Sequence, residues 1–402
     1  MSLTDRLFDF FIARTDPRPL GFARWVLGVA LVLSAVEQGY WLGVWLFAPN
    51  APRIPYAIAL PALPTVLYLP FTVLLFTAAC AFTAGWHTRV AGVTTCLFTG
   101  YLLLVDQQFY GNDLYLVFVL CLLFTISDTG ASLSVDACRG GRRDSVARWP
   151  VVLVKLLLTI VYVFAIVAKL NWPDVAGLHL ASGGFLRDSL IPFPDAWRTP
   201  AWLAVYARAI LVFETALVTA LWVPRYRPWA LTAGFLLHAG IPFAMPAAFV
   251  SLMAFSTIGM AMLAPYVLFL DAAPASRIVV WDDQCTFCRW WITWFRRLDW
   301  LGVHQFVGPG DPHMVPRLGI TREAADEALQ LVALGKRAAG FAAVQQIMEA
   351  LPLTFLWSPI LRLPPLHWGG DRLYRAVAER RRCRVVPLPA HQQGRAAATD
   401  FA

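Results

Sequence analysis

One residue pattern with clear chemical meaning is the Cys-x-x-Cys pair formed by Cys285 and Cys288, preceded by Asp282. A cysteine at a helix start lies near unpaired backbone N–H groups and the positive end of the helix dipole, which stabilise its thiolate. A second cysteine three residues later lies one turn away and can resolve a mixed disulfide. The spacing therefore predicts dithiol–disulfide exchange, with Cys285 the more acidic thiol and the first to react.

A zinc site is the alternative interpretation of the same cysteines. A structural zinc ion needs four protein ligands, and the pair supplies two. The other candidate ligands form no second Cys-x-x-Cys or His-x₃-His pair: His304, His313, His367 and Cys383. We therefore expect no metal at this position.

A second chemical pattern is the lysine at the end of an apolar run, Lys169 in the run 150–171. A charged amine at membrane depth is costly unless it is solvated, paired or neutral. Desolvation lowers the pKa of a lysine, so such a residue can act as a general base near neutral pH. The alternative is a lysine that extends to the membrane surface and marks the interface.

The composition sets the class of protein that must position these residues. Of 402 residues, 58% are hydrophobic and 14% are charged, and the mean hydropathy is +0.59. Soluble domains carry about 25% charged residues. The chain is therefore expected to be an integral membrane protein. The first 19 residues are rich in charge and lack a compact apolar segment, so we expect no cleavable signal peptide.

Apolar runs predict an α-helical polytopic bundle of about eight membrane spans. A span needs about 20 apolar residues. Prolines at 61, 64 and 70 predict a re-entrant or kinked start to the second run. The runs are 20–46, 57–86, 90–105, 114–127, 150–171, 201–223, 229–248 and 250–270.

Arginine placement predicts the orientation of the bundle. With the N-terminus inside, the arginines concentrate on the cytoplasmic side: Arg6, Arg14, Arg18 and Arg24 near the N-terminus, Arg89, and the arginines of the loops around 139–148 and 225–227. An even number of spans also places the C-terminus in the cytoplasm. We expect a bacterial inner-membrane location, and no charge pattern points to nucleic acid.

A small domain follows the bundle. Residues 277–281 are expected to form a buried strand and Cys285 to open an amphipathic helix to about Leu298. Further helices are expected at 322–334 and 341–351. Strand–turn–helix with Cys-x-x-Cys at the junction is typical of a thioredoxin-like α/β fold. The predicted domains are 1–272 and 277–387, followed by a disordered tail, 388–402.

The C-terminal domain resembles the DCC family of thiol-disulfide oxidoreductases over about 277–384. The resemblance implies that Asp282, Cys285 and Cys288 are catalytic. Asp283 stands where that family usually has glycine. The matching segments are Asp282-x-x-Cys285-x-x-Cys288, Arg296-Arg297-Leu298-Asp299, Gly340 to Val344, Leu363-Pro364-Pro365 and Asp371-Arg372-x-Tyr374.

The segment from Tyr162 through Lys169-Leu170-Asn171-Trp172, with Gly177, resembles the membrane domain of vitamin K-dependent γ-carboxylases and their bacterial relatives. This domain is also called the horizontally transferred transmembrane (HTTM) domain, and the resemblance covers about 15–272. It implies that Lys169 deprotonates a reduced isoprenoid quinone related to vitamin K.

Polar residues in or beside the spans are the candidates for holding the quinol. Asn112-Asp113 stands where this family usually has Asn-His, which removes an imidazole but leaves a carboxylate. Glu214 and His238 lie in the middle of the sixth and seventh spans, where a structural hydrogen bond is the alternative role. The expected quinol-binding residues are Asn112, Asp113, Trp172, Glu214 and His238.

Together these features predict a bacterial inner-membrane redox protein. Its membrane domain would bind a lipophilic quinol and support quinol oxidation or epoxidation, and its cytoplasmic domain would exchange disulfides with an unknown thiol partner. The alternative is a non-enzymatic scaffold or transporter whose C-terminal domain senses redox state.

Overall fold

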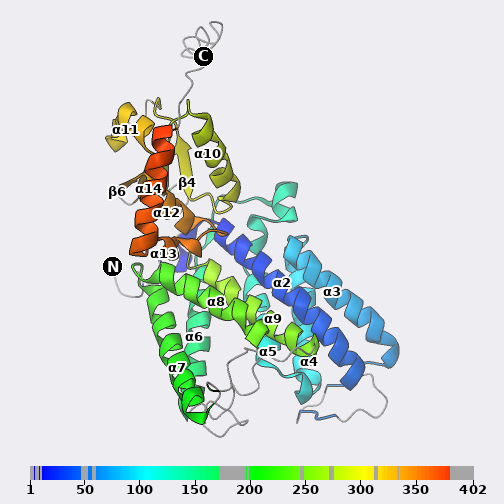
Figure 1. The fold of residues 1–402 in the computed structure, drawn as a ribbon. Coiled ribbons are helices and arrows are strands. Elements are labelled where there is room, and N and C mark those ends of the chain that lie inside the picture. Colours follow the sequence, from blue (N-terminus) through cyan, green and yellow to red (C-terminus); the bar gives the residue numbers. More distant parts are fainter. Residues whose placement is uncertain are drawn as a thin grey trace. The chain divides into compact units, whose positions relative to one another are not determined.

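The structure is a computed structural model in which two compact units, Met1–Asp271 and Ala272–Ala402, follow one another along the chain (Figure 1). Each unit is described by itself. The described residues are 4, 9, 11–46, 53–56, 60–171, 196, 199–244, 249–270, 276–311, 316–333 and 335–380.

The first unit is helical, and every apolar run expected to span the membrane contains one long helix. Two short strands, β1 (Arg14–Thr15) and β2 (Val146–Ala147), pair antiparallel. The long helices are α2 (Arg18–Trp41), α3 (Tyr68–Ala84), α4 (Thr88–Val105), α5 (Asn112–Thr125), α6 (Trp149–Asn171), α7 (Pro200–Trp222), α8 (Arg227–Ala244) and α9 (Phe249–Val267).

Four segments in the described part of the chain are long and apolar enough to cross a membrane: Arg18–Val44, Thr65–Ala84, Thr88–Val105 and Trp149–Ala168. The unit is therefore a membrane domain. At the start of the second run, residues 60–64 are not helical and a 3-10 turn, Thr65–Leu67, precedes α3. Whether this start is re-entrant stays a prediction. Proline lacks an amide N–H and is readily accommodated in the first turn of a helix, where Pro70 lies.

Helix α2 packs extensively against α9 and α3, and its Arg24 is fully buried. The guanidinium donates to the carbonyl oxygens of Phe82 at 2.5 Å, Thr83 at 2.7 Å and Leu133 at 2.6 Å. Two of these carbonyls lie at the C-terminal end of α3, where helix carbonyls lack partners within the helix. Arg24 was expected to be one of the cytoplasmic charges that set orientation, and here it also joins α2 to α3 from inside the bundle.

The second unit contains a four-stranded sheet in the order β4-β3-β5-β6. Strand β3 runs parallel to β4 and antiparallel to β5, and β5 pairs antiparallel with β6. The elements are β3 (Arg277–Val280), α10 (Thr286–Leu298), β4 (His304–Val307), α11 (Arg322–Glu327), β5 (Gln330–Ala333), β6 (Lys336–Ala339), α12 (Phe341–Ala350), α13 (Trp357–Leu361) and α14 (Pro364–Arg380).

The sheet carries helices on both faces. On one face, Ile292 of α10 and Ile347 of α12 pack against Val279 and Leu331 of the sheet. On the other face, Ala325 of α11 packs against neighbouring strand positions. This unit therefore has a mixed α/β core of its own.

The helix expected over 322–334 is wrong in its second half. Helix α11 ends at Glu327, and Gln330 begins strand β5. Gly335, with φ of 73°, adopts the left-handed conformation between β5 and β6. This segment forms a strand rather than continuing the helix, because Leu331 and Val332 pair with residues of β6 across the hairpin. The tail expected to be disordered, 388–402, lies outside the described residues.

Candidate functional sites

The cysteine pair lies where strand β3 gives way to helix α10. Cys285 is the N-cap residue of α10, and its Sγ accepts a hydrogen bond from the backbone N–H of Cys288 at 3.4 Å. Just before it, the carboxylate of Asp282 accepts the backbone N–H of Gln284 at 3.0 Å, closing the turn that leads into the helix. The turn and the helix start thus bring a carboxylate and two thiols to one place.

The side chains of Asp282, Cys285 and Cys288 form one tight cluster. One possible ligand atom from each lies within 4.8 Å of the others, and within the described ranges no other group of three His, Cys, Asp or Glu residues is so arranged. Asp282 is 4% exposed. A buried carboxylate this close to two sulfurs can accept a proton from a thiol, so the cluster is suited to thiol chemistry.

Access to the two sulfurs differs from what the sequence suggests. Cys285, expected to react first, is only 2% exposed, whereas Cys288 is partly exposed. The position at the helix start favours Cys285 as the first thiol to react, whereas the greater exposure of Cys288 favours Cys288. The carboxylate of Asp283, which stands where the resembled family usually has glycine, packs against Gly308: a Cβ added there would lie 2.6 Å from Oδ2.

In the membrane domain, three helices contribute to a buried hydrogen-bonded cluster. The Tyr162 hydroxyl of α6 lies 2.6 Å from Nε2 of His238 on α8 and 2.6 Å from the hydroxyl of Tyr266 on α9. Glu214 of α7 is close enough to act electrostatically on Tyr162. His238 is 5% exposed, and its Nδ1 has no hydrogen-bond partner among the described residues. Two residues chosen from the sequence, Glu214 and His238, therefore converge on Tyr162.

Helices α8 and α9 approach each other closely at this cluster because glycine permits it. A Cβ at Gly234 would lie 2.2 Å from the Tyr266 hydroxyl, and one at Gly259 would lie 2.7 Å from the His238 carbonyl oxygen. Real Cβ atoms do not approach other atoms so closely. The two glycines thus allow Tyr266 to reach Tyr162 and His238.

The remaining membrane candidates lie elsewhere or cannot be placed. Asp113 lies in the first turn of α5 beside Glu37 of α2, and the two carboxyl groups interact. Asn112 is exposed at the same helix start. Lys169 lies in the last turn of α6, but its side chain and the whole of Trp172 are outside the described residues. The contact between Lys169 and the other candidates therefore stays a prediction.

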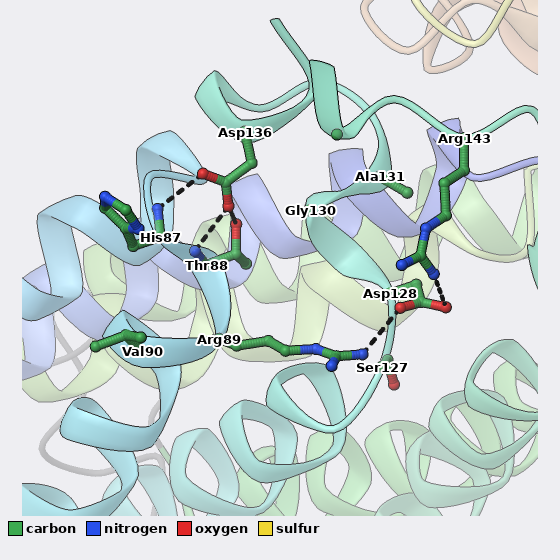
Figure 2. Close-up of a pocket in the computed structure, with 11 residues that line it drawn as sticks. His87, Thr88, Arg89, Val90, Ser127, Asp128, Gly130, Ala131, Asp136 and Arg143 are labelled. Carbon is green, nitrogen blue, oxygen red and sulfur yellow. Dashed lines mark hydrogen bonds and ion pairs between the residues drawn. The ribbon is translucent and has the colours of Figure 1, made fainter. Parts of the chain in front are cut away.

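A polar pocket of about 370 Å³ lies between the start of α4 and the segment 127–143 (Figure 2). Asp128 joins Arg89 at 3.1 Å and Arg143 at 2.8 Å. Asp136 accepts the backbone N–H groups of His87 and Thr88 at the start of α4, as Figure 2 shows. Burial opposes ionisation of Asp136, but these bonds and the Thr88 hydroxyl outweigh it and hold the pKa below its usual value. These acids organise the loops beside the spans.

Sequence reasoning missed Tyr266, and it named Tyr162 without a role. Both tyrosines lie in apolar runs, and an aromatic residue there is usually part of the core. The signal that could have found them is the combination with His238, since a buried imidazole needs hydrogen-bonding partners. That pairing depends on how the helices pack.

The helical domain with membrane-spanning segments and the clustered cysteines define a membrane protein with a thiol redox centre. The HTTM domain family matches residues 12–272, and the chain belongs to this family. The DCC1-like thiol-disulfide oxidoreductase family matches residues 279–384. The protein is therefore a membrane redox protein in which these two domains are fused. No curated protein and no solved structure matches the chain.

Proposed function

We propose that the C-terminal domain catalyses dithiol–disulfide exchange through Cys285 and Cys288. The observation that carries the proposal is the position of Cys285 at the start of α10, where its sulfur accepts the Cys288 N–H at 3.4 Å. A bond of this kind stabilises the negatively charged thiolate, which is the attacking species. The order β3-α10-β4, then α11 and the β5-β6 hairpin followed by α12, supports a thioredoxin-like fold.

The exchange proceeds in two displacements. The Cys285 thiolate attacks a disulfide of the partner protein, forming a mixed disulfide and releasing one partner thiolate. The Cys288 sulfur, having lost its proton, then attacks Sγ of Cys285 and releases the second partner thiolate. The partner disulfide gains two electrons, and the domain is left with a Cys285–Cys288 disulfide. Asp282, beside both sulfurs, accepts the proton that Cys288 gives up.

A trapping experiment tests these roles. In Cys288→Ser, the first displacement still occurs and the second cannot, so a mixed disulfide with the partner accumulates. In Cys285→Ser no adduct forms. If Cys285→Ser accumulates the adduct instead, the roles of the two cysteines are reversed, as the greater exposure of Cys288 would favour.

For the membrane domain we propose binding of a lipophilic quinol, with Lys169 as the base that accepts a proton from a quinol hydroxyl. The cluster of Tyr162, His238 and Tyr266 fits a quinol head group, because it offers hydrogen-bonding groups inside an apolar bundle and His238 Nδ1 has no partner among the described residues. Glu214 lies beside this cluster. Asn112 and Asp113 lie instead at the start of α5, where Asp113 interacts with Glu37, so their role in quinol binding stays a prediction, as does that of Trp172. A bound quinol would supply two electrons and two protons, and its oxidation or epoxidation would require dioxygen as the oxidant.

Mass spectrometry of lipids retained by the purified protein tests this proposal. If the domain binds a quinol, an isoprenoid quinone should co-purify in a near-stoichiometric amount. A His238→Ala variant should retain a smaller amount of it. Absence of any quinone would favour the alternative, a scaffold or transporter whose C-terminal domain responds to redox state. The buried polar groups Glu214 and His238 would then stabilise helix packing.

We further propose an eight-span arrangement in the bacterial inner membrane with both termini in the cytoplasm. Helices α2 to α9, eight among the described residues, and the arginine distribution support it. Reporter fusions after Ala272 test the orientation. A cytoplasmic reporter alone should be active, and a periplasmic signal would mean an odd number of spans.

A further inference from the structure

The helix that begins at the cysteine pair has a large aromatic surface that the rest of its unit leaves open. Its core contacts run through Ile292 and Phe295. The exposed aromatic residues follow the i, i+3, i+4, i+7 spacing that places them on one side of a helix. This aromatic face of α10 consists of Phe287, Trp290, Trp291 and Trp294, which are 44%, 55%, 43% and 42% exposed.

The rings of the aromatic face contact one another. The centroids of Trp290 and Trp291 are 4.9 Å apart, those of Trp290 and Trp294 are 6.0 Å apart, and Phe287 and Trp291 are 6.3 Å apart. A continuous apolar surface of this kind marks an interaction site. Tryptophan, with an apolar body and one polar N–H, is favoured where apolar and aqueous phases meet.

The charges on α10 indicate what the surface meets. Arg289, Arg296 and Arg297 are all exposed, and the sequence of the helix contains no acidic residue. Arg297 lies over the Trp294 ring, 5.5 Å from its centroid. Arg289 and Arg296 lie on the opposite side of the helix, where they contact Asp283 and Phe306. An arginine beside a tryptophan-rich face, as Arg297 is, is typical of helices that lie in the membrane surface and attract anionic lipids.

Chain length keeps this helix near a membrane. Leu270 follows α9 of the membrane domain, and Arg277 begins β3 of the second unit. Seven residues of fully extended chain reach at most about 25 Å. The second unit is therefore tethered close to the bilayer into which the first unit is inserted.

We infer that the aromatic face of α10 inserts into the interfacial layer of the membrane, with Arg297, beside Trp294, on an anionic lipid head group. Cys285 opens the same helix, so this contact holds the thiol pair at the bilayer surface. The partner of the exchange would then be a membrane-bound or membrane-embedded molecule. The surface contact itself does not depend on the exchange activity.

Photoactivatable phospholipids test this inference with the full chain in nanodiscs that contain phosphatidylglycerol. After irradiation and proteolysis, lipid adducts are mapped by mass spectrometry. We expect adducts on the α10 peptide as well as on the membrane spans, and none on the α11 peptide from the other face of the sheet. Adducts on the spans without adducts on α10 would overturn the inference.

Paired variants identify the residues responsible. Trp290→Ser combined with Trp294→Ser should reduce α10 adducts at least about threefold, whereas Trp357→Ser with Trp368→Ser, which removes two exposed tryptophans elsewhere in the unit, should not. Unchanged α10 labelling in the first pair would contradict the proposed role of the aromatic face. Disulfide formation between Cys285 and Cys288 in the same samples reports separately on the exchange proposal.

Discussion

The hydroxyl of Tyr162 lies 2.6 Å from Nε2 of His238, joining α6 to α8 inside the membrane domain. The same hydroxyl also contacts Tyr266 of α9, so one oxygen links three helices. A buried polar atom that loses its partner costs about 1–3 kcal/mol, because no water replaces the lost bond. This oxygen is therefore important for helix packing whether or not the domain binds a quinol.

Tyr162→Phe should lower the stability of the membrane domain by about 1–3 kcal/mol, since it leaves both His238 Nε2 and the Tyr266 hydroxyl without this bond. Tyr266→Phe is the matched control, because it keeps the bond between Tyr162 and His238 and should cost less. Thermal unfolding of the full chain in nanodiscs measures both. Equal stability of Tyr162→Phe and the parent would show that the bond contributes nothing.

Arg24→Lys should destabilise the domain by about 2–4 kcal/mol. Lysine keeps the charge but not the planar group whose nitrogens reach the carbonyls of Phe82, Thr83 and Leu133 together. Arg89→Lys provides a control on an exposed arginine with one ion pair to Asp128, where a change within about 0.5 kcal/mol is expected. A comparable loss of stability in the two variants would contradict the role of Arg24 in joining α2 to α3.

The contrast between Arg24 and the cysteine pair explains what the sequence could predict. Helices followed from apolar runs and the position of Cys285 from a strand–turn–helix pattern, because both depend on local residue order. Arg24 was interpretable only as a charge, since its carbonyl partners belong to segments 58 or more residues away. Tyr266 was missed for the same reason, because its partners lie on other helices. The β5-β6 hairpin was missed because hydrogen bonding between the two strands, rather than the intrinsic propensity of the residues, decides the structure there.

The lowered pKa of Asp299 predicts that the second unit becomes less stable at acidic pH. Its carboxylate is partly buried, which opposes ionisation, but His304 and the backbone N–H groups of Val303 and His304 outweigh this and lower the pKa. A carboxyl group with a lowered pKa in the folded state stabilises the fold above its unfolded pKa of about 3.9. That contribution is lost as the pH falls through the folded value.

The corresponding variant is Asp299→Asn. It should lower the unfolding temperature of the second unit near pH 7 and reduce the further loss between about pH 4 and pH 2. Asp371→Asn, which removes an exposed pair with Arg375 on α14, is the control and should leave the pH profile unchanged. The prediction fails if Asp299→Asn shows the same acid transition as the parent.

Lys169→Arg separates a catalytic lysine from one that only marks the interface. Arginine reaches the membrane surface equally well but does not lose its proton. Quinol turnover should fall by at least about 10²-fold, the usual scale of a lost general base, while insertion and quinone retention stay normal. Full turnover in this variant would leave the membrane domain with a binding or structural role.

The central claim, that Cys285 and Cys288 form a redox-active dithiol, is tested most directly by redox titration of the full chain in nanodiscs. The protein is equilibrated with glutathione buffers of graded ratio, quenched with acid, alkylated and analysed by mass spectrometry of the peptide that contains both cysteines. We predict that the two thiols disappear together in one two-electron transition, and that Cys285→Ser and Cys288→Ser each abolish it. Two thiols that remain reduced at every ratio, or one equivalent of bound zinc, would contradict the claim.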